Sequence, residues 1–360
     1  MAEIARIGIL TSGGDCAGLN PAIRAVVHRA HGYGWQVIGI RNGTAGLFSR
    51  PAECVKLTPE IASGEMLRRG GTILGSTNKG DPFAFPLADG RLLDRSDEVI
   101  EGYRELELGA LVVAGGDGSL HILRRLAEKG GIPLVAIPKT IDNDLGLTEI
   151  SVGHDTAVAT ATDALDHLQP TAASHSRVMV LEVMGRDAGH IALSAGVAGG
   201  ADVILIPEIP YRIARVAEKI DSLKAAGRNF ALVIVAEAVK TETGEPVLVR
   251  HGGGQAGYGG IGHYIAERIG DATGAETRVT VLGHIQRGGM PSARDRIIAS
   301  AFGVHAVDLI AEGSFDRMVA WRERRVTDVP ILDAIRHYQA VDPHGTLARA
   351  ARGLGICLGD

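Results

Sequence analysis

The feature that most constrains the fold is an alternation of short apolar runs with longer amphipathic stretches. The runs consist mostly of Val, Ile, Leu and Ala, which is typical of strands buried on both faces of a parallel sheet. We predict strands at Ile4–Leu10, Gln36–Ile40, Ala110–Ala114, Leu134–Ile137, Val178–Val183, Val203–Ile206, Ala231–Val235 and Val279–Leu282. We predict helices at Pro21–Ala30, Ser119–Lys129, Thr156–Leu168, Ala188–Val197, Ala214–Ala225, Ile261–Ile269 and Ala293–Ile310.

This alternation predicts a doubly wound α/β architecture, in which helices cover both faces of each sheet. A length of 360 residues favours two domains. Because no Pro/Gly/Ser-rich linker marks a boundary, we expect the domains to exchange segments through short crossovers. The predicted fold class is therefore α/β, with two doubly wound, Rossmann-like domains and mostly parallel sheets.

Charge and cysteine content exclude several classes of function. A net charge of −5 argues against a nucleic-acid-binding protein. The three cysteines are odd in number, widely spaced and without a metal-binding pattern, which fits a reduced, cytoplasmic protein. We expect no signal peptide and no membrane span, because no basic leader and no apolar run of about 18 residues is present.

Glycine is abundant, at 49 residues, and two glycine-rich loops follow predicted strands directly. The first loop is Gly13–Asn20 and the second is Gly115–Ser119. Small residues before a helix let backbone N–H groups approach an anion, so both loops are candidate phosphate cradles. The alternative is a tight strand-to-helix turn. Neither loop matches the P-loop or the G-x-G-x-x-G dinucleotide motif.

Carboxylates accompany these loops. Asp117 lies in the second loop, and a carboxylate beside phosphates is unfavourable unless a cation intervenes, so we predict Mg²⁺ there. The segment Pro138–Asp144 combines two carboxylates, Asp142 and Asp144, with a hydroxyl and an ammonium. One carboxylate could accept the proton of an attacking alcohol. The alternative is a polar turn whose side chains bind their own backbone.

Basic and polar side chains lie at the ends of later strands. We expect this set to point toward one crevice, with arginine forks for phosphate oxygens and a glutamate for sugar hydroxyls. Each member taken alone is more often an ordinary surface charge. The set consists of Arg177, Met184, Gly185, Arg186, Glu237, Arg278, His284 and Arg287.

Seven stretches together resemble the phosphofructokinase family. In order they read TSGGDCAGLN, GGTILGS, AGGDGS, PKTIDND, SHSRVMVLEVMGR, VIVAE and RVTVLGHIQRGG. The resemblance runs from residue 7 to about residue 290. It implies a phosphotransferase of glycolysis that transfers a phosphoryl group, from ATP or pyrophosphate, to the 1-hydroxyl of fructose 6-phosphate.

The resemblance also implies roles for single residues. Asp142 resembles the base, with Thr140, Asp144, Arg186 and Gly14 as its catalytic neighbours. The implied donor site comprises Gly14, Asn78, Lys79, Gly116, Asp117, Gly118, Ser119 and Lys139, with Mg²⁺ on Asp117. The implied sugar site comprises Thr140, Asp142, Asp144, Arg177, Met184, Gly185, Arg186, Glu237, Arg278, His284 and Arg287.

Two domains and an oligomer follow from the same resemblance. Residues 1–153 with about 287–340 are expected to hold the donor, and about 154–286 with 341–360 the sugar. In the family, the equivalents of Arg177 and Arg278 enter the neighbouring subunit's site. A homotetramer or homodimer is therefore expected.

The donor is the main question that the sequence leaves open. Gly118 leaves room for the α-phosphate of ATP, whereas Lys139 is typical of enzymes that use pyrophosphate. In the resembled family, an aspartate in place of Gly118 would block the α-phosphate, whereas a flexible lysine can move aside. We therefore predict ATP as the donor, with pyrophosphate as the alternative. A Rossmann-type oxidoreductase and a non-catalytic binding protein are further alternatives. The missing dinucleotide motif disfavours the first, and the acidic cluster disfavours the second.

Overall fold

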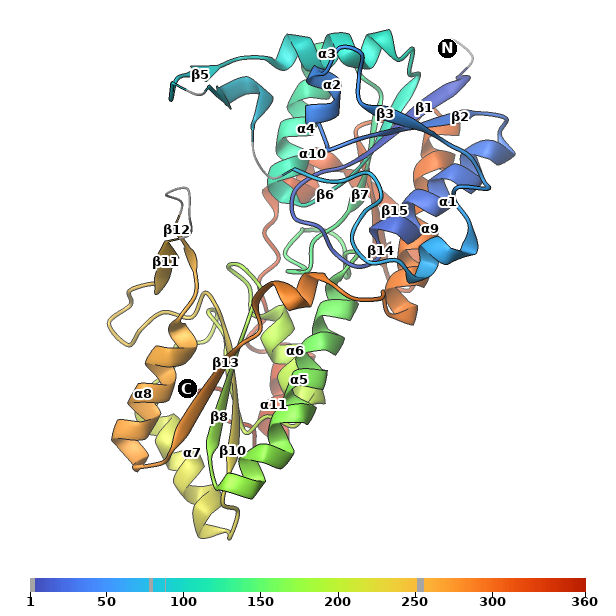
Figure 1. Ribbon diagram of the computed structural model, residues 1–360. Coiled ribbons are helices and arrows are strands. Elements are labelled where there is room, and N and C mark those ends of the chain that lie inside the picture. The colour runs from blue at the N-terminus through green and yellow to red at the C-terminus, as the bar shows by residue number, and fades with distance from the viewer. Residues whose placement is uncertain (1–3, 78–79, 88, 251–255) are drawn as a thin grey trace. The chain divides into compact units, whose positions relative to one another are not determined.

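The computed structural model describes residues 4–77, 80–87, 89–250 and 256–360 (Figure 1). The chain divides into two compact units. One comprises Met1–Ile141, Leu145–Asp155 and Arg287–Tyr338, and the other comprises Asp142–Asp144, Thr156–Gln286 and Gln339–Asp360. Within the described ranges, no helix is both long and apolar enough to cross a bilayer.

The first unit is built on a seven-stranded sheet with the order β15-β14-β7-β6-β1-β2-β3. Its strands are parallel except for β3 and β15, which pair antiparallel with β2 and β14 at the two edges. The strands are β1 (Arg6–Thr11), β2 (Gln36–Ile40), β3 (Cys54–Leu57), β6 (Ala110–Gly115), β7 (Leu134–Pro138), β14 (Arg317–Arg322) and β15 (Arg325–Pro330).

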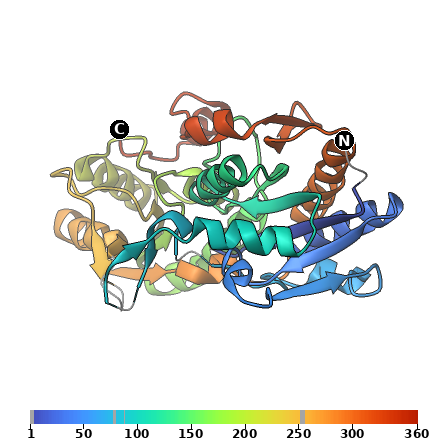
Figure 2. The same cartoon turned by 90° about the horizontal axis from the view of Figure 1, so that it is seen from above.

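Two groups of helices pack on this sheet. Helices α1 (Leu19–Gly32) and α9 (Ala293–Ala311) pack against each other, and helices α3 (Ser96–Glu105), α4 (Asp117–Gly130) and α10 (Ile331–Arg336) form the other group (Figure 2). The second group covers alternate residues of the strands, as the two-residue repeat of a strand requires. The pairs Leu111 and Val113, Leu134 and Ala136, and Met318 and Ala320 share one apolar core with Leu120 and Leu123 of α4.

Smaller elements complete the first unit. They are α2 (Ala45–Phe48), the hairpin of β4 (Phe85–Pro86) and β5 (Leu92–Leu93), and 3₁₀ turns at Gly64–Arg68, Pro82–Ala84 and Gly283–Arg287, the last of which continues from the second unit.

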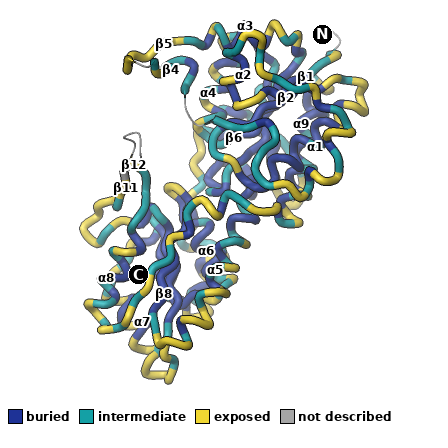
Figure 3. Tube along the Cα trace, in the orientation of Figure 1, coloured by how far each residue is buried: buried dark blue, intermediate teal, exposed yellow. Residues whose placement is uncertain are grey.

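The second unit is built on an all-parallel sheet with the order β13-β8-β10-β9. Both central strands are completely buried, which explains why their sequences are apolar apart from Glu182 (Figure 3). The strands are β8 (Val178–Val183), β9 (Val203–Leu205), β10 (Ala231–Ala236) and β13 (Thr277–Val281), and a hairpin of β11 (Leu248–Arg250) and β12 (Ala256–Tyr258) follows β10. The helices are α5 (His154–His175), α6 (His190–Ala198), α7 (Ile213–Ala225), α8 (Ile261–Thr273) and α11 (Thr346–Gly353).

The predicted fold class is confirmed. Every predicted strand and helix is present, and the strands at Gln36–Ile40 and Val178–Val183 have the predicted bounds. Helix α5 continues seven residues beyond the predicted end at Leu168 and contains Pro170. The elements that were not predicted include the helices α2, α3, α10 and α11, the inner strand β14, the edge strands β3 and β15, and the two short hairpins.

Candidate active site

Strand order reverses in the first unit between β1 and β6, because β2 and β3 lie on one side and β7 and β14 on the other. In doubly wound sheets, ligands bind at the carboxyl ends of the strands that flank such a reversal. The two predicted phosphate loops follow these two strands. They also lie against each other, since a Cβ built on Gly13 would be 2.9 Å from Ser119 Oγ and 3.3 Å from Lys139 Nζ.

Gly14 lies between two cationic side chains. The Lys139 ammonium donates a hydrogen bond to the Gly14 carbonyl oxygen and is only 3% exposed. A Cβ on Gly14 would be 2.1 Å from Arg287 Nη1, so this guanidinium lies directly against the loop and would have to move to admit a side chain at position 14. The structure therefore places Arg287 at the first glycine loop, within the first unit.

The second loop opens directly into α4, whose first residue is Asp117. A Cβ built on the next residue, Gly118, would meet no atom of the described chain within 4 Å. Gly116 lies against the acidic turn, because its Cβ would be 3.8 Å from Thr140 Cβ. The loop thus combines a helix N-terminus, a carboxylate and open space, which is the arrangement that a metal-bound polyphosphate requires.

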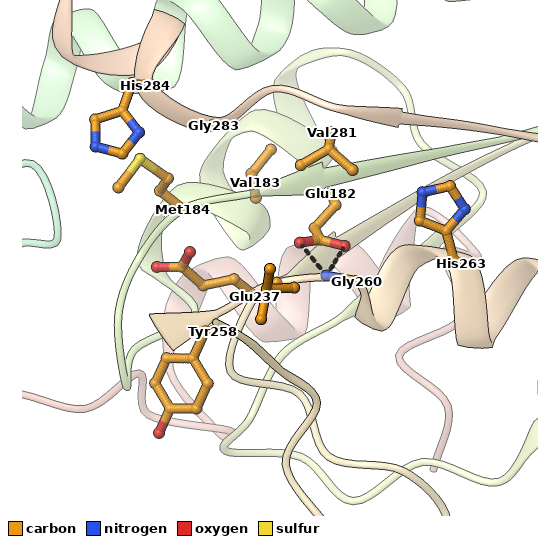
Figure 4. A pocket seen from close by; sticks show the side chains of 12 residues that line it. Glu182, Val183, Met184, Glu237, Tyr258, Gly260, His263, Val281, Gly283 and His284 are labelled. Atoms are coloured by element: carbon orange, nitrogen blue, oxygen red, sulfur yellow. Dashed lines mark hydrogen bonds between the residues drawn. The ribbon is translucent and has the colours of Figure 1, made fainter. Parts of the chain in front are cut away.

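The second unit contains a pocket of about 340 Å³ at the carboxyl ends of β8, β10 and β13 (Figure 4). Met184 and His284 lie at one end and His263 at the other, with Glu237 and Tyr258 along one side. Glu182 also lines the pocket, is 2% exposed and accepts hydrogen bonds from the backbone N–H groups of Gly260 and Gly262. The remaining lining residues are Val183, Val249, Gly259 and Val281, with Gly283 near His284.

The turn Met184–Arg186 borders this pocket through Met184 and is held by two side chains. Glu237 Oε1 accepts hydrogen bonds from the N–H groups of Gly185 (3.3 Å) and Arg186 (2.9 Å). Gln286 Oε1 accepts one from the N–H of Met184 at 2.8 Å. Arg186 has a left-handed backbone with φ 52°, a conformation that such residues keep only where the surroundings enforce it.

The pKa of Glu237 is raised to about 7, mainly because the carboxyl is buried and also because of the negative charge of Asp142, while hydrogen bonds from the backbone of Arg186 and Gly185 lower it. The carboxylate of the predicted base is therefore close enough to the pocket to act on Glu237 electrostatically.

The acidic turn is compact. Asn143 has a left-handed backbone with φ 56°, and Asp144 is 5% exposed. Arg186 Nη1 lies 3.9 Å from Asp144 Oδ2, which links the acidic turn to the turn Met184–Arg186. Three predicted residues, Asp144, Arg186 and Glu237, thus belong to one connected group in the second unit.

The expectation that all the basic residues point toward one crevice is wrong for a single chain. Arg177 precedes β8 and Arg278 lies near the start of β13, where both form ion pairs with Glu276. The pocket lies at the opposite ends of these strands. At about 3.3 Å per residue, the first lining residue along each strand, Glu182 or Val281, is about 16 Å from Arg177 and about 10 Å from Arg278.

Some side chains in this region were not predicted. Tyr258 donates a hydrogen bond to Asp187 at 2.7 Å, and Glu182 and Gln286 hold backbone groups of the pocket. Gln286 lies inside the segment GHIQRGG, which contributes to the family resemblance, so the sequence could have indicated it. Tyr258 lies outside all the segments that carry the resemblance. Asn78 and Lys79, which were predicted to bind the donor, lie outside the described residues.

The protein-family signature described as Phosphofructokinase matches residues 6–310 of the chain. The chain belongs to the phosphofructokinase family. The predicted phosphotransferase class is therefore confirmed. A protein named ATP-dependent 6-phosphofructokinase 1 from Synechocystis sp. is 64% identical, and the alignment covers 100% of both chains. A protein of the same name from Nostoc sp. is 60% identical, again over 100% of both.

Solved structures agree with this assignment. Phosphofructokinase from Saccharomyces cerevisiae matches with a TM-score of 0.78 and 28% identity, covering 98% of this chain and 47% of that longer one. A pyrophosphate-dependent phosphofructokinase from Nitrosospira multiformis matches with a TM-score of 0.81 and 21% identity, covering 99% of this chain and 92% of that one. At that identity, the second match supports the phosphofructokinase fold alone.

Proposed function

We propose that the chain is an ATP-dependent 6-phosphofructokinase, which transfers the terminal phosphoryl group of ATP to fructose 6-phosphate and forms fructose 1,6-bisphosphate. The relatives at 64% and 60% identity carry this activity in their names. The observation that carries the choice of ATP is the open space at Gly118, where a side chain would meet no described atom within 4 Å. That space can accommodate an α-phosphate.

We assign the donor to the first unit. Backbone N–H groups of the loops at Gly14 and Gly116, together with Ser119, suit its phosphates, and the N-terminus of α4 favours their negative charge. Lys139 is tethered to the Gly14 carbonyl, and this contact holds its charge beside the first loop without filling the space at Gly118. Asn78 and Lys79 are retained as donor contacts in this proposal.

Mg²⁺ fits the site as a partner of the phosphates. Within the described residues, no group of three or more His, Cys, Asp or Glu side chains could hold a metal ion. Magnesium commonly takes one or two carboxylates and completes its shell with phosphate oxygens and water, so Asp117 suffices as the protein ligand. When bound, the ion would offset negative charge on the donor phosphates.

We assign the sugar to the pocket of the second unit. Met184, Gly185, Arg186 and Glu237 would contact its hydroxyl groups, and His284 its 6-phosphate. Asp142 would accept the proton of the 1-hydroxyl as that oxygen attacks phosphorus, with Thr140 and Asp144 beside it. Arg186 would offset negative charge near Asp144.

Arg177 and Arg278 are assigned to the 6-phosphate of a neighbouring subunit, because they lie at the strand ends opposite the pocket of their own chain. A homodimer or homotetramer follows from this assignment. We retain Arg287 as a phosphate ligand, although its contact with Gly14 also makes it a candidate for the donor phosphates. The proposed setting is cytoplasmic, without nucleic-acid or membrane partners.

The test is a coupled assay with fructose 6-phosphate and Mg²⁺, with either ATP or pyrophosphate as donor. Turnover with ATP alone supports the proposal. Turnover with pyrophosphate alone would mean that Lys139 outweighs Gly118. Turnover with neither donor would refute the assignment as a phosphofructokinase.

A further inference from the structure

The C-terminal segment enters the second unit at Gln339, and this residue contacts the acidic turn directly. Its main-chain N–H donates to the Asp144 carbonyl oxygen at 2.9 Å. Its side-chain Nε2 donates to the Asn143 carbonyl oxygen at 3.3 Å. Two successive carbonyl groups of the turn are therefore bound by one residue that lies almost 200 positions later in the sequence.

Gln339 is itself held by the start of α6. Its carbonyl oxygen is 2.8 Å from His190 Nε2, which must carry the proton because a carbonyl can only accept. Two residues on, the Val341 N–H donates to Glu208 Oε1 at 2.9 Å. The same carboxylate accepts the Gly189 N–H at 3.0 Å, so helix, tail and turn form one hydrogen-bonded chain.

The approach of these segments depends on a residue without a side chain. A Cβ on Gly189 would be 2.4 Å from Ile206 Cβ and 2.8 Å from Glu208 Oε2. Gly189 thus lets the start of α6 pack directly on the strand end that carries Glu208. The position of Gln339 is consequently set by packed elements of the second unit.

The backbone before Asp142 is held separately, within the first unit. Ser151 Oγ donates to the Thr140 carbonyl oxygen at 2.6 Å, and His154 Nδ1 lies 2.7 Å from the Ile141 carbonyl oxygen. Gln339 supplies the corresponding contacts after Asp142. Isolated bridges from Lys139 to Val152 and from Leu145 to Tyr338 flank this segment, and Gln339 binds the carbonyl groups of the two residues between Asp142 and Leu145.

We propose that Gln339 is a positioning residue for phosphoryl transfer, which orients the Asp142 carboxylate by holding the carbonyl groups of Asn143 and Asp144. This inference rests on the proposed function, in which Asp142 is the base. Proton transfer depends on the distance and direction of the base, so a small displacement of the turn lowers turnover. Gln339 itself is not among the proposed substrate contacts, so the proposed sugar contacts of Met184, Glu237 and His284 and the donor contacts of the first unit should be preserved.

The first experiment uses Gln339→Met, which retains length and volume but removes the side-chain donor. The expected result is a fall in kcat of about threefold to tenfold, which is what one neutral hydrogen bond supports. KM values for fructose 6-phosphate and ATP should stay within about twofold, and the melting temperature within a few degrees. The matched control is Ala340→Gln, which places the same amide at the next, exposed position and should leave kcat unchanged.

A second variant, Gln339→Glu, tests the pH dependence of kcat, which a merely structural role of Gln339 would not change. A protonated carboxyl can donate to the Asn143 carbonyl, whereas an ionised one cannot. The ratio of its kcat to that of Gln339→Met should therefore rise as the pH falls from 8 to 6.

Several results would overturn the inference. These are an unchanged kcat in Gln339→Met, a raised KM at unchanged kcat, a loss of kcat that merely follows a lower melting temperature, and a ratio that does not depend on pH. An inactive wild-type protein would instead refute the proposed function.

Discussion

Replacing Gly118 by aspartate is the perturbation that most sharply tests how the donor is chosen. The residue is the second of α4, it is exposed, and an added Cβ meets no described atom within 4 Å. Its φ is not in the left-handed region, so a side chain causes no backbone strain there. An acidic residue in the first turn of a helix also gains about 0.3–1 kcal/mol from the helix dipole. The folded protein should therefore tolerate Gly118→Asp without loss of stability.

The effect on ATP follows from Coulomb's law. We take a separation of about 5 Å between the introduced carboxylate and an α-phosphate in the space beside Gly118. Two like charges at about 5 Å repel by about 3 kcal/mol at an effective dielectric constant of 20. Since about 1.4 kcal/mol corresponds to a factor of ten, kcat/KM for ATP should fall by roughly two orders of magnitude. Pyrophosphate has no α-phosphate, so this substitution should not weaken its use.

The assay measures kcat/KM for ATP at saturating fructose 6-phosphate, together with thermal melting. Gly118→Asn has the same shape as the aspartate variant but no charge, and should lose much less. Gly118→Ala should remain close to wild type. If Gly118→Asp kept its ATP activity within about threefold, the α-phosphate could not occupy this space. If Gly118→Ala lost as much activity as Gly118→Asp, the loss would be steric, and the electrostatic explanation would be wrong.

Three further predictions concern the sugar side. Asp142→Asn should lower kcat by about 10²–10⁴-fold with little change in KM for fructose 6-phosphate, as steady-state kinetics would show. Arg278→Ala should be inactive alone. Subunit exchange with Asp142→Asn should restore roughly a quarter of the activity, because half of the dimers are hybrids and each hybrid has one intact site of two. No recovery would contradict the proposal that Arg278 acts in the site of the neighbouring subunit. The pKa of Glu237 is raised from 4.5 to about 7 in the folded chain. Between about pH 4.5 and pH 7 the folded chain therefore keeps a proton that the unfolded chain releases, and the free energy of unfolding falls as the pH rises through this range. At pH 8, the free energy of unfolding of Glu237→Gln, measured by chemical denaturation, should exceed that of wild type by about 1–3 kcal/mol. This difference should vanish near pH 4.5.

The sequence predicted the buried parts of the fold well. The strand at Val178–Val183 is apolar except for Glu182, which is buried and bonded to the backbone of Gly260 and Gly262. Such runs have few alternatives to a central strand. The hairpin Leu248–Tyr258 and the strand Arg325–Pro330 were not predicted, because partly exposed edge strands mix polar and apolar residues.

The sequence identified residues of one local segment more readily than contacts between distant segments, and the assigned roles stay predictions. The loops at Gly13 and Gly116 were found because a strand, glycines and a helix follow one another. Gln339 could not be found, because its contact with Asn143 depends on how distant segments pack. The expected convergence of Arg278 with the pocket failed because a strand carries its two ends to opposite edges of the sheet.

The most direct test of the central claim is the initial rate of purified protein with fructose 6-phosphate, Mg²⁺ and either ATP or pyrophosphate. The account predicts formation of fructose 1,6-bisphosphate with ATP and little or none with pyrophosphate. Turnover with pyrophosphate alone would contradict the proposed role of Gly118, and absence of turnover with both donors would contradict the proposed function itself.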